Sequence, residues 1–179
     1  LALAGDPDRL EPAQRAVDFL TAAQNPVKGG WKYRPLTDTG IGDLSVTGWA
    51  LMALHTARMA RIEVSPETYL LASSFLDSVQ ESPTEDAFYK YRPDWQTEPS
   101  QRWSMTAEGL LCRQWLGWQR EDPSMVRGVE FLLSEPNTPL WKDGRRNLYA
   151  WYYTAQTLHN IGGDGWVEWY ARAQAEIVD

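Results

Sequence analysis

A phenylalanine-leucine pair recurs three times at one interval along this chain of 179 residues. The pairs begin at Phe19, Phe75 and Phe131, so each lies 56 residues after the one before. A period this long, with helical patterning inside it, indicates stacked helical units, because one unit alone cannot bury its apolar face. The interval therefore favours a repeat protein whose function lies on a surface that several repeats share.

A second repeated segment fits the same period. The tetrapeptide at 32–35, Lys-Tyr-Arg-Pro, returns at 90–93, which is 58 residues later and places two extra residues in one loop. Ser65-Pro66 and Asp122-Pro123 both combine an N-cap residue with proline at the first helical position, and they lie 57 residues apart. These signals divide the chain into repeats at about 11–64, 65–121 and 122–163, followed by a terminal helix at 164–179.

The hydrophobic spacing inside the repeats is that of helices. The first helix of each repeat, helix A, is expected at about 12–24 and after the two proline-marked starts. The second helix, helix B, is expected at about 46–61, 105–118 and 148–161, and a last amphipathic stretch covers 165–177. No segment shows the sustained alternation of a β-strand. The sequence thus predicts an all-α fold in one domain spanning 1–179, built from about three α/α-hairpins and a terminal helix.

The first repeat carries a specific motif. It consists, in order, of Arg15, Ala16, Phe19, Leu20, Gln24, Gly30 and Trp31. This arrangement closely resembles the QW motif of squalene and hopene cyclases. The later copies are less complete, since Gln80 is kept without a Gly-x-Trp, and in the third repeat Pro136 replaces the glutamine while Trp141 survives.

The resemblance implies the α/α-toroid fold of the terpene cyclases and protein prenyltransferases, in which inner and outer helices alternate around an apolar, aromatic-lined cavity. It also implies structural rather than catalytic roles for the motif residues Gln24, Gly30, Trp31, Gln80 and Trp141. A glutamine can satisfy helix-terminal groups that have no partner within the helix. At ~56 residues a hairpin, a six-hairpin toroid needs about twice this chain. The sequence therefore resembles half a ring, and we expect it to be part of a longer protein.

Charge and cysteine content exclude several classes of partner and cofactor. A net charge of −7 and a pI of about 4.9 disfavour nucleic acid and anionic membranes as the main partner. No apolar run approaches the ~18 residues of a transmembrane segment. Cys112 is the only cysteine, which excludes an intramolecular disulfide. Because the two histidines form no Cys/His cluster, we expect neither a metal site nor a cofactor.

Asp43 is the first candidate catalytic residue. Cyclases that begin their reaction by protonation carry an Asp-x-Asp-Asp motif before an inner helix. The matching stretch here, 40–43, reads Gly-Ile-Gly-Asp, so Asp43 is its one remaining acid and Gly42 occupies the place of the family's proton donor. A general acid depends on neighbouring carboxyl groups and burial to set its pKa. The alternative role for Asp43 is to cap the following helix.

Glu108 is the second candidate catalytic residue. It lies among small and apolar residues, at the position where the first repeat has Trp49. If the B helices face inward, its carboxyl group is removed from water, which raises a carboxyl pKa and makes the group a candidate acid or base. The alternatives are an ion pair with an arginine such as Arg102 or Arg146, or a side chain that faces solvent.

Ten tryptophans and eight tyrosines, against four phenylalanines, supply many aromatic rings with a polar atom. We expect six of these residues to bind a ligand: Trp49, Tyr91, Trp103, Tyr149, Trp151 and Tyr152. In the family that the motif resembles, such rings stabilise carbocations through their faces. The alternatives are that the rings fill the core and brace loops, or that they stack on carbohydrate.

These features predict a toroid-like repeat module that lacks the family's known catalytic motifs and binds an apolar ligand or a partner chain on its inner-helix face. The first alternative is a cyclase-like isomerase acting on a polyprenoid, with Asp43 or Glu108 as the acid. The second is a carbohydrate-active toroid, which requires two carboxylates flanking a cleft. Because half a ring leaves its concave face open, we expect a cover there. The candidates are the missing half of the toroid, a second copy of the chain, a long aromatic loop or an apolar small molecule.

Overall fold

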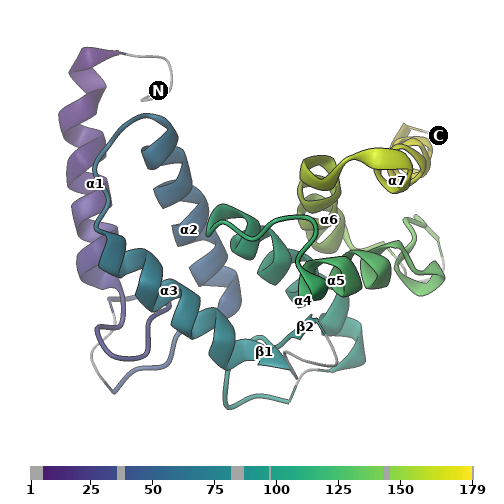
Figure 1. Ribbon diagram of the computed structural model, residues 1–179, viewed down its shortest axis with the longest axis horizontal. Coiled ribbons are helices and arrows are strands. Elements are labelled where there is room, and N and C mark those ends of the chain that lie inside the picture. The colour runs from purple at the N-terminus through teal and green to yellow at the C-terminus, as the bar shows by residue number, and fades with distance from the viewer. Residues whose placement is uncertain (1–5, 36–38, 82–86, 97, 143–145, 179) are drawn as a thin grey trace. The chain divides into compact units, whose positions relative to one another are not determined.

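The computed structural model describes residues 6–35, 39–81, 87–96, 98–142 and 146–178. Seven α-helices contain most of these residues, and the only strands among them have two residues each. The predicted all-α fold class is thereby confirmed (Figure 1). The arrangement as repeats and as half a toroid remains a prediction.

Contacts divide the chain into two compact units. The first unit, Leu1–Val79 with Tyr91–Asp94, holds α1 (Leu10–Ala23), α2 (Leu44–Met59) and α3 (Pro66–Val79). The second unit, Gln80–Lys90 with Trp95–Asp179, holds β1 (Gln80–Glu81), β2 (Phe88–Tyr89), α4 (Pro99–Trp115), α5 (Pro123–Leu133), α6 (Leu148–Ile161) and α7 (Gly163–Val178). Short 3-10 helices precede α1 at Pro7–Arg9 and follow α5 at Glu135–Asn137. The division falls inside the predicted repeat 65–121, and the predicted single domain stays a prediction.

In the first unit α1 and α2 lie side by side, and α3 packs against α2 (Figure 1). The Tyr69 hydroxyl of α3 donates to the Leu54 carbonyl of α2 over 3.1 Å. Gln24, directly after α1, donates its side-chain amide to the Thr68 carbonyl of α3 over 3.0 Å. Side-chain to backbone hydrogen bonds therefore join α3 both to α2 and to the end of α1.

In the second unit α4 is the central helix. It contacts α5, α6 and β2, and every residue from 103 to 113 is buried. A helix covered on all sides needs small or apolar residues around its whole circumference. Gly109 meets this need, because a Cβ atom there would lie 2.4 Å from the Tyr89 ring of β2. Gly128 of α5 similarly leaves room for Leu110 of α4, which lies 2.5 Å from where a Cβ would be.

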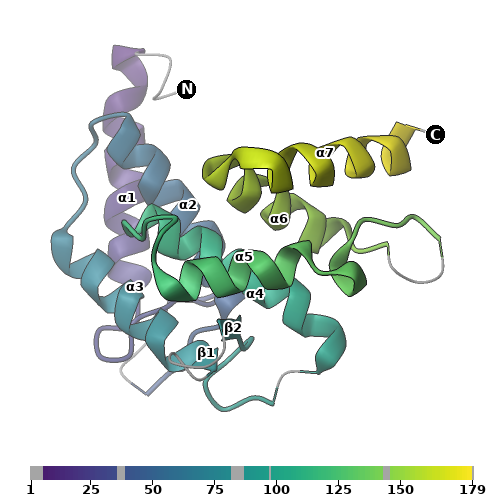
Figure 2. The same cartoon turned by 45° about the vertical axis from the view of Figure 1, so that its right-hand side comes forward.

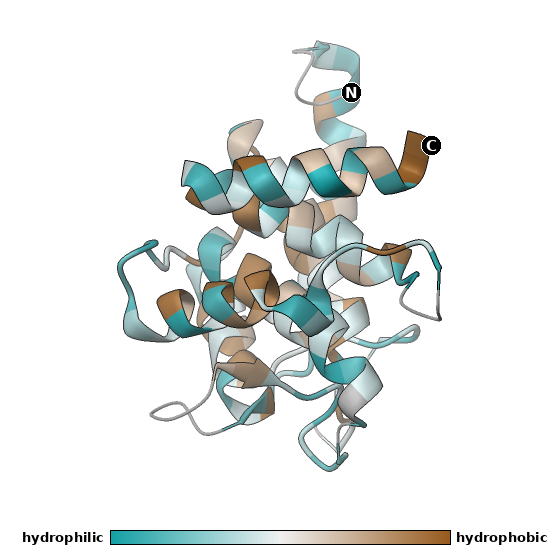
Figure 3. Cartoon of the chain, turned by 90° about the vertical axis from the view of Figure 1, so that its right-hand side faces the viewer, coloured by the Kyte–Doolittle hydropathy of each residue, from teal (hydrophilic) through white to brown (hydrophobic). Residues whose placement is uncertain are grey.

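The terminal helix α7 follows α6 through Gly162 and Gly163, whose φ angles are 74° and 77°. Residues with a side chain rarely adopt positive φ, so this pair of glycines allows the chain to change direction at once. α7 then lies across α6 (Figure 2). Hydrophobic and hydrophilic bands alternate along α7 in Figure 3, as expected of an amphipathic helix.

One prediction about helix bounds is wrong. The sequence predicts the second B helix at 105–118 with Ser104 as its cap, whereas α4 spans Pro99–Trp115. Glu98 is extended and Pro99 occupies the first turn, so the helix begins six residues earlier and Ser104 is buried inside it. The sequence shows no sustained alternation of a β-strand, and β1 and β2 are consistent with this because strands of two residues are too short to show it.

Candidate functional site

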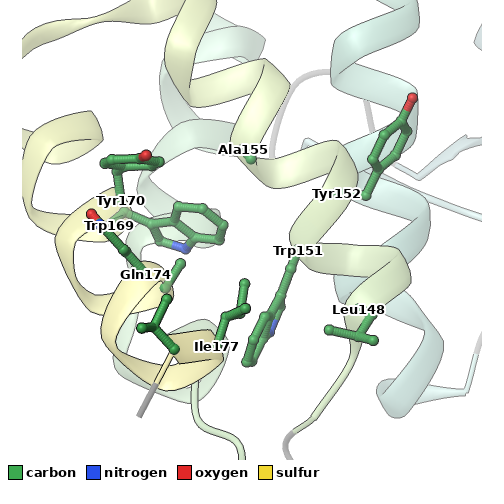
Figure 4. Close-up of a pocket in the computed structure, with 10 residues that line it drawn as sticks. Leu148, Trp151, Tyr152, Ala155, Trp169, Tyr170, Gln174 and Ile177 are labelled. Carbon is green, nitrogen blue, oxygen red and sulfur yellow. The ribbon is translucent and has the colours of Figure 1, made fainter.

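A groove of about 370 Å³ lies between α6 and α7. Its walls are formed on α6 by Leu148, Trp151, Tyr152 and Ala155, and on α7 by Trp169, Tyr170, Ala173, Gln174, Ile177 and Val178 (Figure 4). The volume is at the lower end of the ~300–1,000 Å³ that is typical of ligand pockets. None of these ten residues is charged, and Gln174 is the one amide among them. The groove therefore offers a ligand apolar and aromatic surface.

Residue spacing on both helices brings these side chains into the groove. On α7, Trp169, Ala173 and Ile177 follow one another at intervals of four residues and so share one face of the helix. On α6, Trp151 and Ala155 have the same spacing. One face of each helix thus supplies one wall.

The tryptophans are the most deeply placed residues of the walls. Trp151 is 3% exposed and Trp169 is 4% exposed, whereas Tyr152 is 44% exposed. Figure 4 shows the two indoles with Ile177 between them, and Tyr152 directed away from both. Trp166 stacks beside Trp169 with 6.5 Å between ring centroids. The indoles form the interior of the groove, and Tyr152 lies at its rim.

Trp151 and Tyr152 are the two predicted ligand-binding residues that line this groove. Trp103, a third one in the same unit, is 7% exposed, and its indole N–H donates to the Thr154 hydroxyl over 3.1 Å. Trp103 therefore joins α4 to α6 in the core.

Tyr149, the fourth predicted ligand-binding residue of this unit, belongs to a buried cluster around Glu108. Its hydroxyl donates to Oε2 of the fully buried Glu108 over 2.9 Å. Burial, and next the charge of Glu108, raise the pKa of Tyr153 far above the usual range of a phenol. The same two causes raise the pKa of the Cys112 thiol well above its ordinary value. The cluster consequently holds phenol and thiol groups in their neutral forms around one carboxyl group.

Burial excludes a solvent-facing Glu108, one of the alternatives for this residue. The two arginines considered as its partners make other contacts: Arg102 lies 3.5 Å from Glu81, and Arg146 lies over the Trp141 ring at 5.0 Å. Glu108 is not among the residues that line the groove.

Asp43 lies in the first unit, at the start of α2. Its carboxylate accepts a hydrogen bond from the Val46 backbone N–H over 2.9 Å, which is the geometry of a helix cap. Its own backbone N–H donates to the Trp31 carbonyl over 3.0 Å. Tyr91, another predicted ligand-binding residue, lies close by, and its backbone carbonyl accepts from the Leu44 N–H over 2.9 Å. Burial, and next the charge of Asp43, raise the pKa of the Tyr91 phenol.

The motif residues of the first repeat tie the loop after α1 to its surroundings. The Trp31 indole N–H donates to the Leu20 carbonyl in the last turn of α1 over 2.7 Å, and the Trp31 backbone N–H donates to the Thr47 hydroxyl of α2 over 3.0 Å. Gly30 has a φ of 73°, and a Cβ there would lie 2.6 Å from the Phe75 ring of α3. Only glycine suits both the backbone conformation and the close approach.

The later motif residues, Gln80 and Trp141, differ in burial. Gln80 is buried, and its side-chain oxygen accepts from Nη2 of Arg113 over 3.1 Å. Arg113 is itself 1% exposed and also donates to the Tyr89 hydroxyl over 3.0 Å. Trp141 is 41% exposed, and its ring lies 6.3 Å from that of Trp151. Gln80 thus binds a buried arginine, whereas Trp141 lies beside a residue of the groove.

Trp49, the remaining predicted ligand-binding residue, lines a smaller groove of about 220 Å³ in the first unit. Phe19 and Trp31 line it too, together with the basic residues Lys32 and Arg34. Trp49 is half exposed. The six predicted ligand-binding residues therefore belong to two different units, and they do not form one site.

The α7 wall of the groove is absent from the sequence-based predictions. A signal for it exists in the four-residue interval of Trp169, Ala173 and Ile177 within the predicted helix 165–177. The spacing identifies an apolar face, but it does not identify the neighbour of that face.

No protein-family model, curated protein or solved structure matches this chain. The resemblance to the QW motif of the cyclases therefore stays a prediction from the residues. In the part of the chain that the structure describes, no helix combines the length and apolar character needed to cross a membrane. Among the same residues, no group of three or more His, Cys, Asp or Glu side chains is arranged to hold a metal ion.

Proposed function

We propose that this chain is a binding module for a small apolar ligand, which occupies the groove between α6 and α7. The observation that carries the proposal is the groove itself, with its volume of about 370 Å³ and ten uncharged lining residues, four of which are Trp or Tyr. Removing apolar ligand surface from water is favourable by roughly 25 cal/mol per Å². Aromatic walls also favour flat or ring-shaped ligands through stacking.

The proposal keeps the prediction of a QW-repeat module without the family's known catalytic motifs. α6 coincides with the third predicted B helix, so one wall of the groove belongs to a helix on which the toroid resemblance leads us to expect ligand contacts. The terminal helix α7 supplies the opposite wall. The proposed site therefore has both of its walls within this chain, and neither a missing half of the toroid nor a second copy of the chain is needed to cover α6.

Both enzyme alternatives require acids that the groove walls do not carry. A cyclase-like isomerase needs a proton donor at its ligand, and the ten lining residues include no Asp or Glu. A carbohydrate-active site needs two carboxylates across a cleft, which these residues do not provide either. The uncharged walls therefore favour binding over acid-catalysed chemistry in this groove.

The test is isothermal titration calorimetry with 1-tetralone, a neutral bicyclic ketone. We expect saturable binding at one site with a dissociation constant of roughly 1 mM or lower, as befits a ligand of this size. Ala155→Phe places a ring in the groove and should weaken binding at least about tenfold, by the cost of overpacking the occupied site. Ala171→Phe, on the exposed face of α7, is the matched control and should leave binding unchanged.

Two further ligands separate the alternatives. Cellobiose should show no heat of binding, and binding by cellobiose instead of 1-tetralone would favour the carbohydrate reading. Farnesol tests the polyprenoid reading, and its conversion to a cyclic product, followed by mass spectrometry, would establish an enzyme. Binding of 1-tetralone that Ala155→Phe leaves intact would place the ligand elsewhere and contradict the proposal.

A further inference from the structure

Two buried indole N–H groups in the walls of the groove have no hydrogen-bond acceptor among the described residues. They are Nε1 of Trp151 and Nε1 of Trp169, and both side chains are more than nine-tenths buried. Two other buried indoles are satisfied: Trp31 donates to the Leu20 carbonyl over 2.7 Å, and Trp103 donates to a hydroxyl over 3.1 Å. The donors of Trp151 and Trp169 differ from these two, and both belong to one groove.

An unpaired buried donor is costly, because it has lost its hydrogen bonds to water without a replacement. Native structures keep few such groups, and each one asks for an explanation. Here one donor comes from α6 and the other from α7, so the walls that face each other both carry one. A ligand that supplies an acceptor would pair these donors and remove that cost.

The chemistry of the walls restricts what that acceptor can be. An indole nitrogen only donates, so the ligand atom must accept. No lining residue is charged, so an anionic ligand group would lose its hydration without gaining a cation. A neutral oxygen, as in a ketone, an ester, an ether or an alcohol, fits both conditions.

The two indole nitrogens can donate to a ligand only if their rings move. Both nitrogens are shielded from water, so each indole ring must turn for a ligand to reach its N–H. The torsion that turns an aromatic ring has a broad minimum, so the torsional energy of a modest rotation is small. Figure 4 shows both rings beside Ile177, a residue that is 60% exposed at the open side of the groove.

We infer that the ligand of this groove is an oxygenated apolar molecule, whose neutral oxygen accepts a hydrogen bond from Trp169 or Trp151. This inference rests on the proposed function and adds the class of ligand. The two tryptophans are then the residues that distinguish an oxygenated ligand from a hydrocarbon of the same shape.

The test compares 1-tetralone with tetralin, the hydrocarbon of the same bicyclic skeleton. The measured quantity is the ratio of their dissociation constants, because the difference in hydration between the two ligands cancels when that ratio is compared between protein variants. Trp169→Phe and Trp151→Phe each remove one N–H and keep an aromatic ring. At least one of them should shift the ratio towards tetralin by about tenfold or more. Trp95→Phe changes a half-exposed tryptophan outside the groove walls, so it is the control and should leave the ratio unchanged.

A second measurement needs no variant that might fold poorly. In the wild-type protein labelled with nitrogen-15, 1-tetralone should move the indole N–H proton of Trp169 or Trp151 downfield, and tetralin should not. Two outcomes overturn the inference in distinguishable ways. If both ligands bind and neither the ratio nor the indole protons respond to the ketone, the inference fails while the proposed function stands. If neither ligand binds, the proposed function fails and the inference with it.

Discussion

At the scale of single residues, Trp31 holds the loop after α1 in place. Its side chain is 2% exposed and bonded to the end of α1, whereas Trp49 of the same unit is half exposed. We expect Trp31→Ala to lower the free energy of unfolding by about 3–5 kcal/mol, as for other large-to-small changes in a core. Trp49→Ala, the matched control, should cost clearly less. Equal losses in urea denaturation would contradict a special structural role for Trp31.

The raised pKa of Tyr153 predicts that the protein loses stability at high pH. Its pKa is raised in the fold by burial and by Glu108, whereas an unfolded tyrosine has its ordinary value of 10.0. Above pH 10 the unfolded chain releases this proton and the folded chain keeps it, so the free energy of unfolding falls as the pH rises. One such group contributes at most about 1.4 kcal/mol per pH unit.

Replacing Tyr153 by Phe should therefore reduce the loss of stability between pH 10 and pH 11. The comparison is made by urea denaturation at a series of pH values. Tyr170→Phe serves as the control, because Tyr170 is 49% exposed, and it should leave the pH dependence as it is in the wild type. Identical pH profiles for the wild type and Tyr153→Phe would show that the phenol does not retain its proton in the fold.

At the scale of elements, the starts of α3 and α5 are predicted correctly from the sequence, whereas the central helix α4 is predicted to begin six residues too late. α3 begins at Pro66 and α5 at Pro123, as the two capping dipeptides predict. α4 begins at Pro99, after the extended Glu98. What covers α4 could not be predicted, because its contacts with α5, α6 and β2 join residues that are distant in sequence. Its buried Glu108 could be recognised as an acid among apolar residues, but its partner Tyr149 depends on how α6 packs.

The glycines of the second unit test how closely its elements pack. Alanine is the better helix former by roughly 1 kcal/mol, so propensity alone predicts that Gly109→Ala stabilises α4. We expect the opposite, because the new Cβ would lie 2.4 Å from the buried Tyr89 ring, and overpacking costs typically about 1–3 kcal/mol. Gly165→Ala is the matched control. Its Cβ would meet only the methyl end of the partly exposed Leu133, which can move.

Thermal denaturation distinguishes the two variants. The packing argument predicts a lower melting temperature for Gly109→Ala and an unchanged or higher one for Gly165→Ala. A rise for both variants would mean that helix propensity outweighs packing at α4, and that β2 does not lie tightly against this helix.

At the scale of the whole molecule, one wall of the candidate site follows from the sequence and the other does not. Trp151 and Tyr152 can be identified because they belong to a predicted B helix rich in aromatic residues. To predict the α7 wall, one would need to know the direction of the chain after Gly162 and Gly163. Glycine can adopt both positive and negative φ angles, so the sequence leaves that direction open. The half-ring resemblance predicts an open face on the B helices, whereas at α6 the terminal helix supplies the opposite wall.

The central claim is that an apolar ligand binds between α6 and α7, and fluorine NMR tests it most directly. All ten tryptophans are replaced by 5-fluorotryptophan, and single Trp→Phe variants assign the resonances. On titration with 1-tetralone, we predict saturable shifts for Trp151 and Trp169, and none for Trp31 of the first unit. Shifts confined to Trp31 and Trp49 would place the ligand in the smaller groove, and an unchanged spectrum at saturating ketone would exclude binding; either result would contradict the account.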